Sequence, residues 1–290
     1  MIYETTYKDR FAITVEGKEL TAVFLPKDGG KLASLKTLAG IELLEQAKGD
    51  HYLPLTIDGS YIDAECSAFD DMFPTIDPCT MAKHDYPDHG EVCRREHKWE
   101  IKSGILRLSC MVESVNAEFT KEITGDEAGI SIRYTIRNLS TKPLPYIWAG
   151  HMMFAGKPGA VVFSNAPEGS GIQVMFGNVP DTPEKISHFT PNGESYKYYI
   201  TEPFTPLVCG IRYSNGATIT VSFDENTVRW LGVWMNNGSF KGMYNLALEP
   251  CTAPYDSPKN AENKNAGSVI PGEGSIRFTM HLRYDISTPN

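Results

Sequence analysis

The sequence has little positive charge, no long apolar run and no paired cysteine motif, and each absence excludes a class of protein. Its 290 residues carry 27 basic and 36 acidic side chains, for a net charge of −9. A nucleic-acid binder needs a basic surface that displaces counterions from phosphates, so we expect no nucleic-acid partner. No stretch approaches the roughly 20 apolar residues that cross a bilayer, and the acidic balance disfavours an anionic membrane surface. We therefore expect no membrane partner either.

The cysteines and the first residues point to a reducing compartment. None of the six thiols forms a C-x-x-C pair, so neither a zinc knuckle nor a redox pair is indicated. The thiols are those of Cys66, Cys79, Cys93, Cys110, Cys209 and Cys251. Met1 to Phe11 include four charged residues and lack the apolar centre of a signal peptide. We expect reduced, mostly buried thiols and a cytoplasmic location.

Helical periodicity is scarce, whereas alternation of apolar and polar residues is common. Ile130–Arg137, Thr218–Phe223 and Ile276–Tyr284 alternate in this way, which predicts half-buried strands. Asn215-Gly216 predicts a hairpin with a type I′ turn, because both residues tolerate positive φ. Residues 32–46 are predicted as two strands with a turn at Gly40, and Ser257–Gly267 as a surface loop or short helix.

Many short strands with turns spread along the chain predict an all-β protein. The arrangement expected is a large sandwich of antiparallel sheets, bigger than an immunoglobulin domain. No stretch resembles an interdomain linker, so residues 1–290 are predicted to form one domain. A wide sheet face would then be available as a binding surface.

One segment with unusual polar character is His84–Trp99. It contains Asp88, His89 and Gly90, followed by a basic group made of Arg94, Arg95 and Lys98. Three interpretations are open: a solvated loop, a loop that contacts a sugar, and a metal site formed by His84, Asp88 and His89. The spacing of the two histidines is not a standard ligand spacing.

Two further segments place an ionisable residue inside an apolar strand. His151 lies within Tyr146–Phe154 and is either a core histidine with satisfied hydrogen bonds or a catalyst paired with a carboxylate. Glu249 ends the apolar part of Leu246–Asp256. It either points to water from an edge strand or is a general base whose pKa is raised by burial.

Two lesser features are compatible with a ligand site. Phe69–Pro78 carries Asp70, Asp71, Asp77 and Phe73, and is read either as an acidic turn or as a loop lining a site. Trp230 and Trp234 stand four residues apart on a predicted strand and share one face, which suits a core or a platform for a sugar.

The three main segments, in this order, resemble the aldose 1-epimerase (galactose mutarotase) superfamily. The resemblance rests on Asp88-His89-Gly90-Glu91, on Trp148 to Phe154 with His151 at its centre, and on Leu248-Glu249-Pro250. It implies a large antiparallel β-supersandwich with a sugar site in an open cleft. It also implies an isomerase of carbohydrate metabolism that interconverts α and β anomers, with a small-molecule carbohydrate as partner and neither cofactor nor metal.

The resemblance further implies roles for three residues. Glu249 matches the general base that takes the proton from the anomeric hydroxyl, and His151 matches the general acid that protonates the ring oxygen. His89 matches a second histidine near that oxygen. The protein is expected to be a monomer or a homodimer.

The sequence departs from the family pattern at two positions that bind sugar hydroxyls. An arginine ahead of the first histidine is missing around Phe69–Pro74, and an aspartate is missing at Ser187-His188-Phe189. Hydroxyl recognition should therefore differ. Candidate substrate contacts are Asp71, Phe73, Asp88, Arg94, Trp148 and Trp234. Two alternatives stay open: a non-catalytic carbohydrate-binding protein on the same fold, and a hexose-6-phosphate epimerase that uses the basic group Arg94, Arg95 and Lys98.

Overall fold

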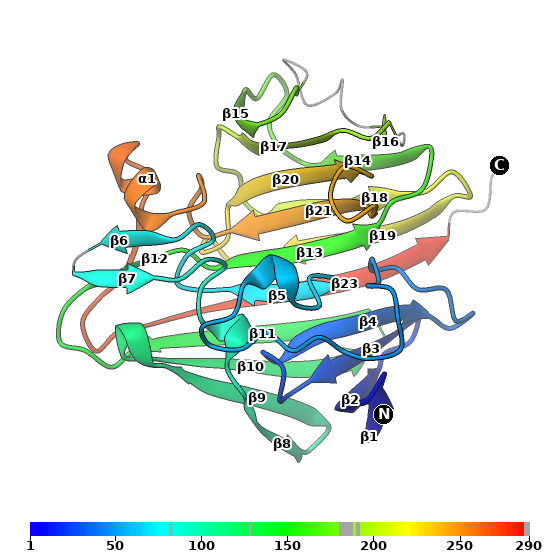
Figure 1. The fold of residues 1–290 in the computed structure, drawn as a ribbon, viewed down its shortest axis with the longest axis horizontal. Coiled ribbons are helices and arrows are strands. Elements are labelled where there is room, and N and C mark those ends of the chain that lie inside the picture. The colour runs from blue at the N-terminus through cyan, green and yellow to red at the C-terminus, as the bar shows by residue number, and fades with distance from the viewer. Residues whose placement is uncertain (82, 128, 180–187, 190–191, 287–290) are drawn as a thin grey trace.

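The computed structural model describes residues 1–81, 83–127, 129–179, 188–189 and 192–286. Two large antiparallel sheets make up most of it (Figure 1). The ten-stranded sheet has the order β1 (Ile2–Tyr7), β2 (Arg10–Glu16), β3 (Leu20–Leu25), β4 (Lys31–Thr37), β5 (Phe69–Met72), β13 (Ala149–Ala155), β21 (Tyr244–Cys251), β20 (Trp230–Asn237), β17 (Ser195–Ile200) and β15 (Ile172–Phe176).

The nine-stranded sheet packs against the first. Its order is β16 (His188–Phe189), β14 (Ala160–Ser164), β18 (Leu207–Arg212), β19 (Ala217–Phe223), β23 (Ser275–Ile286), β11 (Gly129–Asn138), β10 (Ala117–Asp126), β9 (Ile105–Val112) and β8 (Lys98–Lys102). Two small sheets pair β6 (Cys79–Met81) with β7 (His84–Tyr86) and β12 (Leu144–Tyr146) with β22 (Ser268–Ile270). The all-β antiparallel sandwich predicted from the sequence is confirmed.

Helical structure is confined to short segments. The α-helix α1 (Pro258–Asn263) is capped by Ser257, whose side chain accepts a hydrogen bond from the Asn260 N–H. It lies inside Ser257–Gly267, as the short-helix interpretation expected. Three 3₁₀ turns, η1 (Tyr61–Asp63), η2 (Val92–Arg94) and η3 (Glu113–Val115), complete the set in the described residues. No helix of the described chain is long and apolar enough to cross a membrane.

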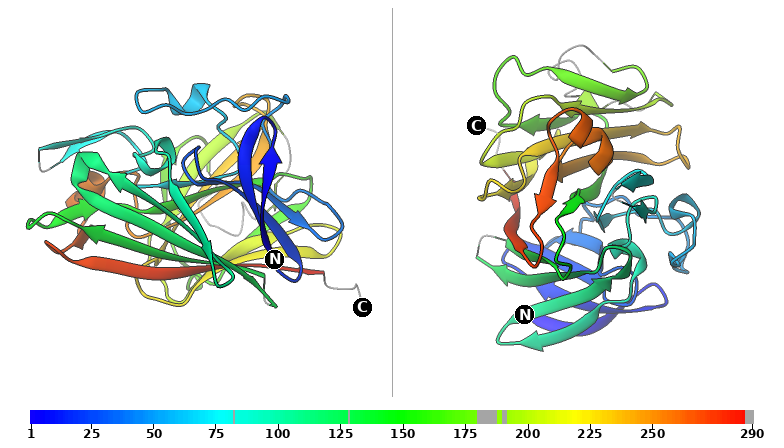
Figure 2. Two further views of the ribbon diagram at one scale, coloured as in Figure 1. Left: turned by 90° about the horizontal axis from the view of Figure 1, so that it is seen from below. Right: turned by 90° about the vertical axis from the view of Figure 1, so that its left-hand side faces the viewer.

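The alternating pattern fixes which side chains form the core between the two sheets. In β11, Ile130, Ile132, Tyr134 and Ile136 are buried, and the residues between them are more exposed. The inward side chains of β23 meet them from the adjacent strand. Because side chains alternate across a strand, one face of each sheet enters this core. The two layers are seen edge-on in Figure 2.

Two local predictions need refinement. The hairpin of β18 and β19 forms at Asn215-Gly216, but only Gly216 has a positive φ, of +84°. Its N–H donates to the Tyr213 carbonyl, which makes Ser214 and Asn215 the central residues of the turn. Neither has a positive φ, so the turn is not type I′, which needs a positive φ at both central residues. Within residues 32–46 the chain is extended, but only β4 is a full strand. The part after Gly40 forms isolated bridges at Glu42 and Leu44.

The opposite face of the ten-stranded sheet carries a second group of buried residues. In β21, Leu246 and Leu248 join the core between the sheets, whereas Cys251 belongs to a separate cluster with Trp230 and Tyr199. Alternation places Glu249 on that second face. Loops and 3₁₀ turns cover this face over the middle strands, and the candidate site lies there.

Candidate active site

Five neighbouring strands align one row of side chains across the sheet. The register pairs Asp70 of β5 with His151 of β13, and Met152 with Leu248, which sets His151 beside Glu249 of β21. Glu249 is paired with Gly232 of β20, and Gly232 with Tyr199 of β17. The order of strands in the sheet thus assembles residues that are up to 179 positions apart, from Asp70 to Glu249.

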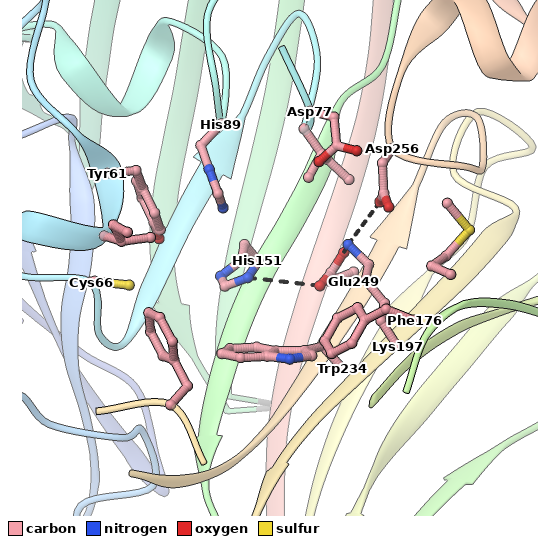
Figure 3. Close-up of a pocket in the computed structure, with 14 residues that line it drawn as sticks. Tyr61, Cys66, Asp77, His89, His151, Phe176, Lys197, Trp234, Glu249 and Asp256 are labelled. Carbon is pink, nitrogen blue, oxygen red and sulfur yellow. Dashed lines mark ion pairs between the residues drawn. The ribbon is translucent and has the colours of Figure 1, made fainter. Parts of the chain in front are cut away.

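An open pocket of about 320 Å³ lies over this row. Its ionisable wall consists of Asp77, His89, His151, Lys197, Glu249 and Asp256. Its remaining lining is mainly aromatic and apolar: Tyr61, Ile62, Ile76, Met175, Phe176, Trp234 and Phe240, together with Cys66. Figure 3 shows the polar groups converging on the space above Trp234. Such a combination of apolar surface and few convergent polar groups is typical of a small-molecule site.

Glu249 and His151 form the centre of the pocket. Glu249 Oε1 lies 3.7 Å from His151 Nε2, and both side chains are almost fully buried. Burial raises the pKa of Glu249, against the lowering effect of the Lys197 ammonium. Burial, together with His89, Lys197 and Lys31, holds the pKa of His151 well below its usual range. Burial therefore disfavours the charged form of both groups.

Lys197 bridges two carboxylates at the end of the pocket. Its Nζ lies 2.7 Å from Glu249 Oε2 and 2.7 Å from Asp256 Oδ1. Burial by itself would lower the pKa of Lys197, but Asp256 and Glu249 outweigh it and raise the pKa above its ordinary value. The hydroxyl of Tyr199 donates to Asp256 Oδ1 at 2.7 Å. Lys197 is therefore held as a cation between two carboxylates.

His89 approaches from a tight loop after β7. It adopts φ +60° and is followed by Gly90 at +71°, where a Cβ would collide with the backbone of Phe73. Its Nδ1 lies 2.9 Å from Asp88 Oδ2. Its ring stacks on Tyr61 with centroids 3.8 Å apart, and lies edge-on to His151 at 5.8 Å. Asp88 thus orients the histidine, and Tyr61 fixes the plane of its ring.

Trp234 provides a flat apolar surface beside the ionisable wall. It stands opposite Lys197 in the register of β17 and β20. Its ring centroid lies 5.9 Å from that of His151 and 5.9 Å from that of Phe240. Trp230, on the same face of β20, is buried in the cluster beneath and does not line the pocket. Trp230 thus fits the core interpretation, whereas Trp234 lines the pocket.

The structure brings together four of the predicted site residues, namely His89, His151, Glu249 and Trp234. Asp88 contributes only through His89. Asp71 and Trp148 do not line the pocket, because alternation turns them into the core between the sheets. There Lys121 Nζ lies 2.7 Å from Asp71 Oδ2, and the indole N–H of Trp148 donates to Asp71. The prediction that Asp71 and Trp148 contact the substrate is therefore wrong, because both belong to a buried polar group inside the sandwich.

Phe73 and Arg94 also lie outside the pocket lining. Phe73 is fully buried and packs against Phe119 and Tyr146. The Arg94 guanidinium donates to backbone carbonyls of Thr56, Ile57, Gly59, Asp88 and Gly90. It ties two loops together. With Arg95 and Lys98 it lines a different groove, which also contains Glu96, Glu113 and Glu118.

The metal interpretation of His84, Asp88 and His89 finds no support in the arrangement of side chains. Within the described residues, no three histidine, cysteine or acidic side chains are grouped so that they could hold a metal ion. His84 stacks instead on Tyr86 of its own strand.

Three residues that line the pocket were not assigned from the sequence: Lys197, Asp256 and Tyr61. A lysine between tyrosines in the strand Ser195–Ile200 was a usable signal, because a buried cation needs a partner. Asp256 ends a segment already singled out for Glu249. Asp77, from the acidic segment Phe69–Pro78, does line the pocket. Ser187, where the family aspartate is missing, lies outside the described residues.

The arrangement of the two sheets corresponds to a known fold. A ten-stranded and a nine-stranded antiparallel sheet, with ionisable groups gathered on the outer face of the first, form the galactose mutarotase-like fold. No protein-family model and no curated protein matches the chain. The similarity to known proteins therefore appears in the comparison of structures.

Among solved structures, the Slr1438 protein of Synechocystis sp. PCC 6803 superposes with a TM-score of 0.74 at 15% identity, over 99% of this chain and 100% of that one. A provisional aldose 1-epimerase from Escherichia coli K12 gives 0.68 at 13% identity, over 99% of both chains. A galactose mutarotase-like protein from Lactobacillus casei gives 0.67 at 16% identity, over 94% and 100%. At these identities the likeness establishes the fold.

Proposed function

We propose that the protein interconverts the α and β anomers of a neutral free sugar by general acid–base catalysis. The observation that carries the proposal is the 3.7 Å approach of Glu249 and His151 at the base of an open pocket. The two oxygens involved in anomer exchange, O1 and O5, are bonded to the same carbon. A base and an acid that serve both oxygens must therefore lie within a few ångströms of each other.

The reaction balances with these two groups alone. Glu249 takes the proton from the O1 hydroxyl as the C1–O5 bond breaks, and His151 gives a proton to O5. The product is the open-chain sugar with an aldehyde at C1. Rotation about C1–C2 presents the other face of the aldehyde. On reclosure Glu249 gives its proton to O1, and His151 recovers a proton from the O5 hydroxyl. General acid–base contributions of this kind are typically about 10² to 10⁴-fold.

The proton affinities of the pair suit this exchange. Burial raises the pKa of Glu249 and lowers that of His151, so it favours a strong base at Glu249 and a readily released proton at His151. The productive form has the proton on His151 and the negative charge on Glu249. His89, oriented by Asp88, faces the same space and would donate to the ring oxygen or a neighbouring hydroxyl.

The charges in the pocket favour a neutral substrate over a sugar phosphate. Among the described lining residues, Lys197 is the one lysine or arginine, and its Nζ is already engaged by Glu249 and Asp256. A phosphate would face Asp77 as well as those two carboxylates. The basic group Arg94, Arg95 and Lys98, which kept the phosphate alternative open, lines another groove.

The test is anomer exchange measured by saturation-transfer NMR or polarimetry over a panel of free hexoses, pentoses and their 6-phosphates. We expect acceleration of at least one free sugar and none of the phosphates. Acceleration of no sugar would refute the proposal, and acceleration of phosphates alone would refute the neutral substrate. Saturable binding by calorimetry without acceleration would instead identify a carbohydrate-binding protein.

A further inference from the structure

The ion pair of Lys197 divides the two oxygens of Glu249 between different tasks. Oε2 lies 2.7 Å from the ammonium, whereas Oε1 faces His151 and the pocket. We propose that Lys197 is a positioning residue that keeps Glu249 ionised with Oε1 turned to the substrate, and that Asp256 limits this effect by sharing the cation. The inference rests on the proposed function.

A carboxylate buried as deeply as Glu249 needs such a partner. Its side chain is 1% exposed, and an isolated buried carboxylate takes up a proton instead of staying charged. A protonated Glu249 could not accept the O1 proton. Lys197 is the cation that meets it directly, and the pairing also removes one of the two orientations of the carboxylate. Base strength and geometry therefore depend on the same contact.

Asp256 is held rigidly, so the cation is shared at a fixed position. Its backbone carbonyl accepts hydrogen bonds from the N–H groups of Ile76 and Asp77, and its carboxylate accepts one from Tyr199. Its Oδ1 lies 2.7 Å from Lys197 Nζ, the same distance as Glu249 Oε2. Asp256 thus withdraws attraction from Glu249 and adds a negative charge nearby, and both effects favour protonation of Glu249.

The other ionisable groups around Glu249 define the background for a pH experiment. His151 approaches from β13, His89 from the loop after β7, and Tyr199 from β17 beside Lys197. Asp77 lines the pocket beyond Asp256, and Cys251 follows on the strand of Glu249 itself. Further out on the row, Asp70 is neutralised by Lys31 at 2.5 Å.

Replacing Lys197 and replacing Asp256 should shift the pH profile of kcat/KM in opposite directions. The quantity to follow is the acid limb, the pH below which kcat/KM falls because Glu249 becomes protonated. In Lys197→Met, the loss of the cation makes Glu249 harder to ionise, so the acid limb should move up by roughly 1–3 pH units. In Asp256→Asn, which retains an acceptor for Tyr199, Lys197 serves Glu249 alone and the acid limb should move down. A residue that merely supports the fold would reduce activity without displacing the limb in either variant.

The matched control is Lys8→Met. Lys8 pairs with Glu65 at 2.6 Å in a comparably sheltered lysine–glutamate contact, but it does not line the pocket. The acid limb of the kcat/KM profile of Lys8→Met should stay at the wild-type pH. Unchanged limbs in both Lys197→Met and Asp256→Asn, or an equal shift in Lys8→Met, would overturn the inference. If Lys197→Met does not fold, the test is Asp256→Asn alone: a downward shift of its acid limb supports the inference, and an unchanged limb overturns it.

A readout without turnover separates this inference from the proposed function. Infrared titration of the carboxyl stretch, with Glu249→Gln to assign the signal, reports the ionisation of Glu249 directly. The signal should titrate at higher pH in Lys197→Met than in wild type and at lower pH in Asp256→Asn. If wild type exchanges no sugar, the proposed function fails. The inference about Lys197 fails if the Glu249 signal titrates at the same pH in wild type, Lys197→Met and Asp256→Asn.

Discussion

Gly232 lies directly opposite Glu249 in the register of β20 and β21, and the space above it is filled by the ring of Tyr199. A Cβ at this position would stand 2.8 Å from Tyr199 Cε1 and 3.3 Å from Glu249 Cβ. The absence of a side chain thus lets Tyr199 cross β20 and reach Asp256. The contacts from Tyr199 through Asp256 and Lys197 to Glu249 depend on that glycine.

Gly232→Ala should therefore displace Tyr199 and weaken the whole chain of contacts. We expect a loss of roughly 1–3 kcal/mol in the free energy of unfolding, as for overpacked cores, with a fall in anomer exchange. Urea unfolding followed by circular dichroism measures the first effect. Gly267→Ala is the control, because a Cβ there meets only ordinary contacts of 3.4 Å or more. Equal stability of the two variants would contradict the packing argument.

Glu249→Gln should abolish most catalysis while preserving the shape of the side chain. The amide cannot accept the O1 proton, so we expect kcat to fall by about 10² to 10⁴-fold. Sugar binding, measured by calorimetry, should change much less, because Trp234 and the remaining polar groups are intact. Full activity in a folded Glu249→Gln protein would exclude this residue as the base.

Asp88→Asn should impair His89 without disturbing the centre of the pocket. Asp88 Oδ2 lies 2.9 Å from His89 Nδ1. Burial by itself would raise the pKa of Asp88, but the contact with His89 outweighs it and lowers the pKa. Removing one partner of a buried polar contact costs about 1–3 kcal/mol, so we expect a loss in kcat of roughly tenfold. His89→Asn should produce a similar loss, and the double variant should add little. Additive losses would show that the two residues act separately.

Trp234→Ala should weaken sugar binding more than it slows the chemical step. An aromatic contact contributes about 0.5–1.5 kcal/mol beyond the buried area, which corresponds to a rise in Kd of up to about tenfold. Quenching of tryptophan fluorescence by the sugar should also disappear. Trp99→Ala is the control, since Trp99 lies on the exposed strand β8 and packs against Phe11. Loss of quenching in Trp99→Ala would contradict this assignment.

Stability should decline on acidification because of His97, which is remote from the catalytic groups. Burial, helped by the charge of Lys121, lowers the pKa of His97 to about 3. In the unfolded chain the imidazole binds a proton near pH 6.5, so between pH 6.5 and 3 the unfolded state binds more protons. Its contribution is complete above pH 6.5 and falls by about 1.4 kcal/mol per pH unit within that window.

Chemical denaturation at several pH values tests this sign. His97→Leu should flatten the slope of unfolding free energy against pH between 6 and about 4, whatever its effect at pH 8. A slope as steep as that of wild type would assign the acid sensitivity to other groups. His151, whose pKa is also lowered by burial, is the first alternative.

The strands and the central catalytic candidates were predictable because they leave local patterns. Alternation in Ile130–Arg137 has a period of two, and a histidine and a glutamate in otherwise apolar strands violate that pattern visibly. The turn at Asn215-Gly216 was located but its type was not, because turn type depends on how β18 and β19 twist against each other. Local sequence does not specify that twist.

The substrate contacts predicted around Phe69–Met72 show where local reasoning ended. Asp70 and Asp71 are adjacent and chemically alike, yet alternation sends one to the row beside His151 and the other to Lys121 between the sheets. Choosing between them requires the strand order of β4, β5 and β13. Similarly, Arg94 has the chemistry of a phosphate ligand, but each nitrogen of its guanidinium donates to a backbone carbonyl of the surrounding loops.

The sequence by itself determined the all-β character and the location of Glu249 and His151 in apolar strands, where an ionisable side chain that is buried without a partner is destabilising. These follow from residue types and short-range periodicity. Only the tertiary structure decided which groups stabilise Glu249. Lys197 and Asp256 reach it because β17, β20 and β21 are neighbours in the sheet and because Gly232 leaves room between them. Pairing between distant strands is set by packing of the whole core, which no local pattern encodes.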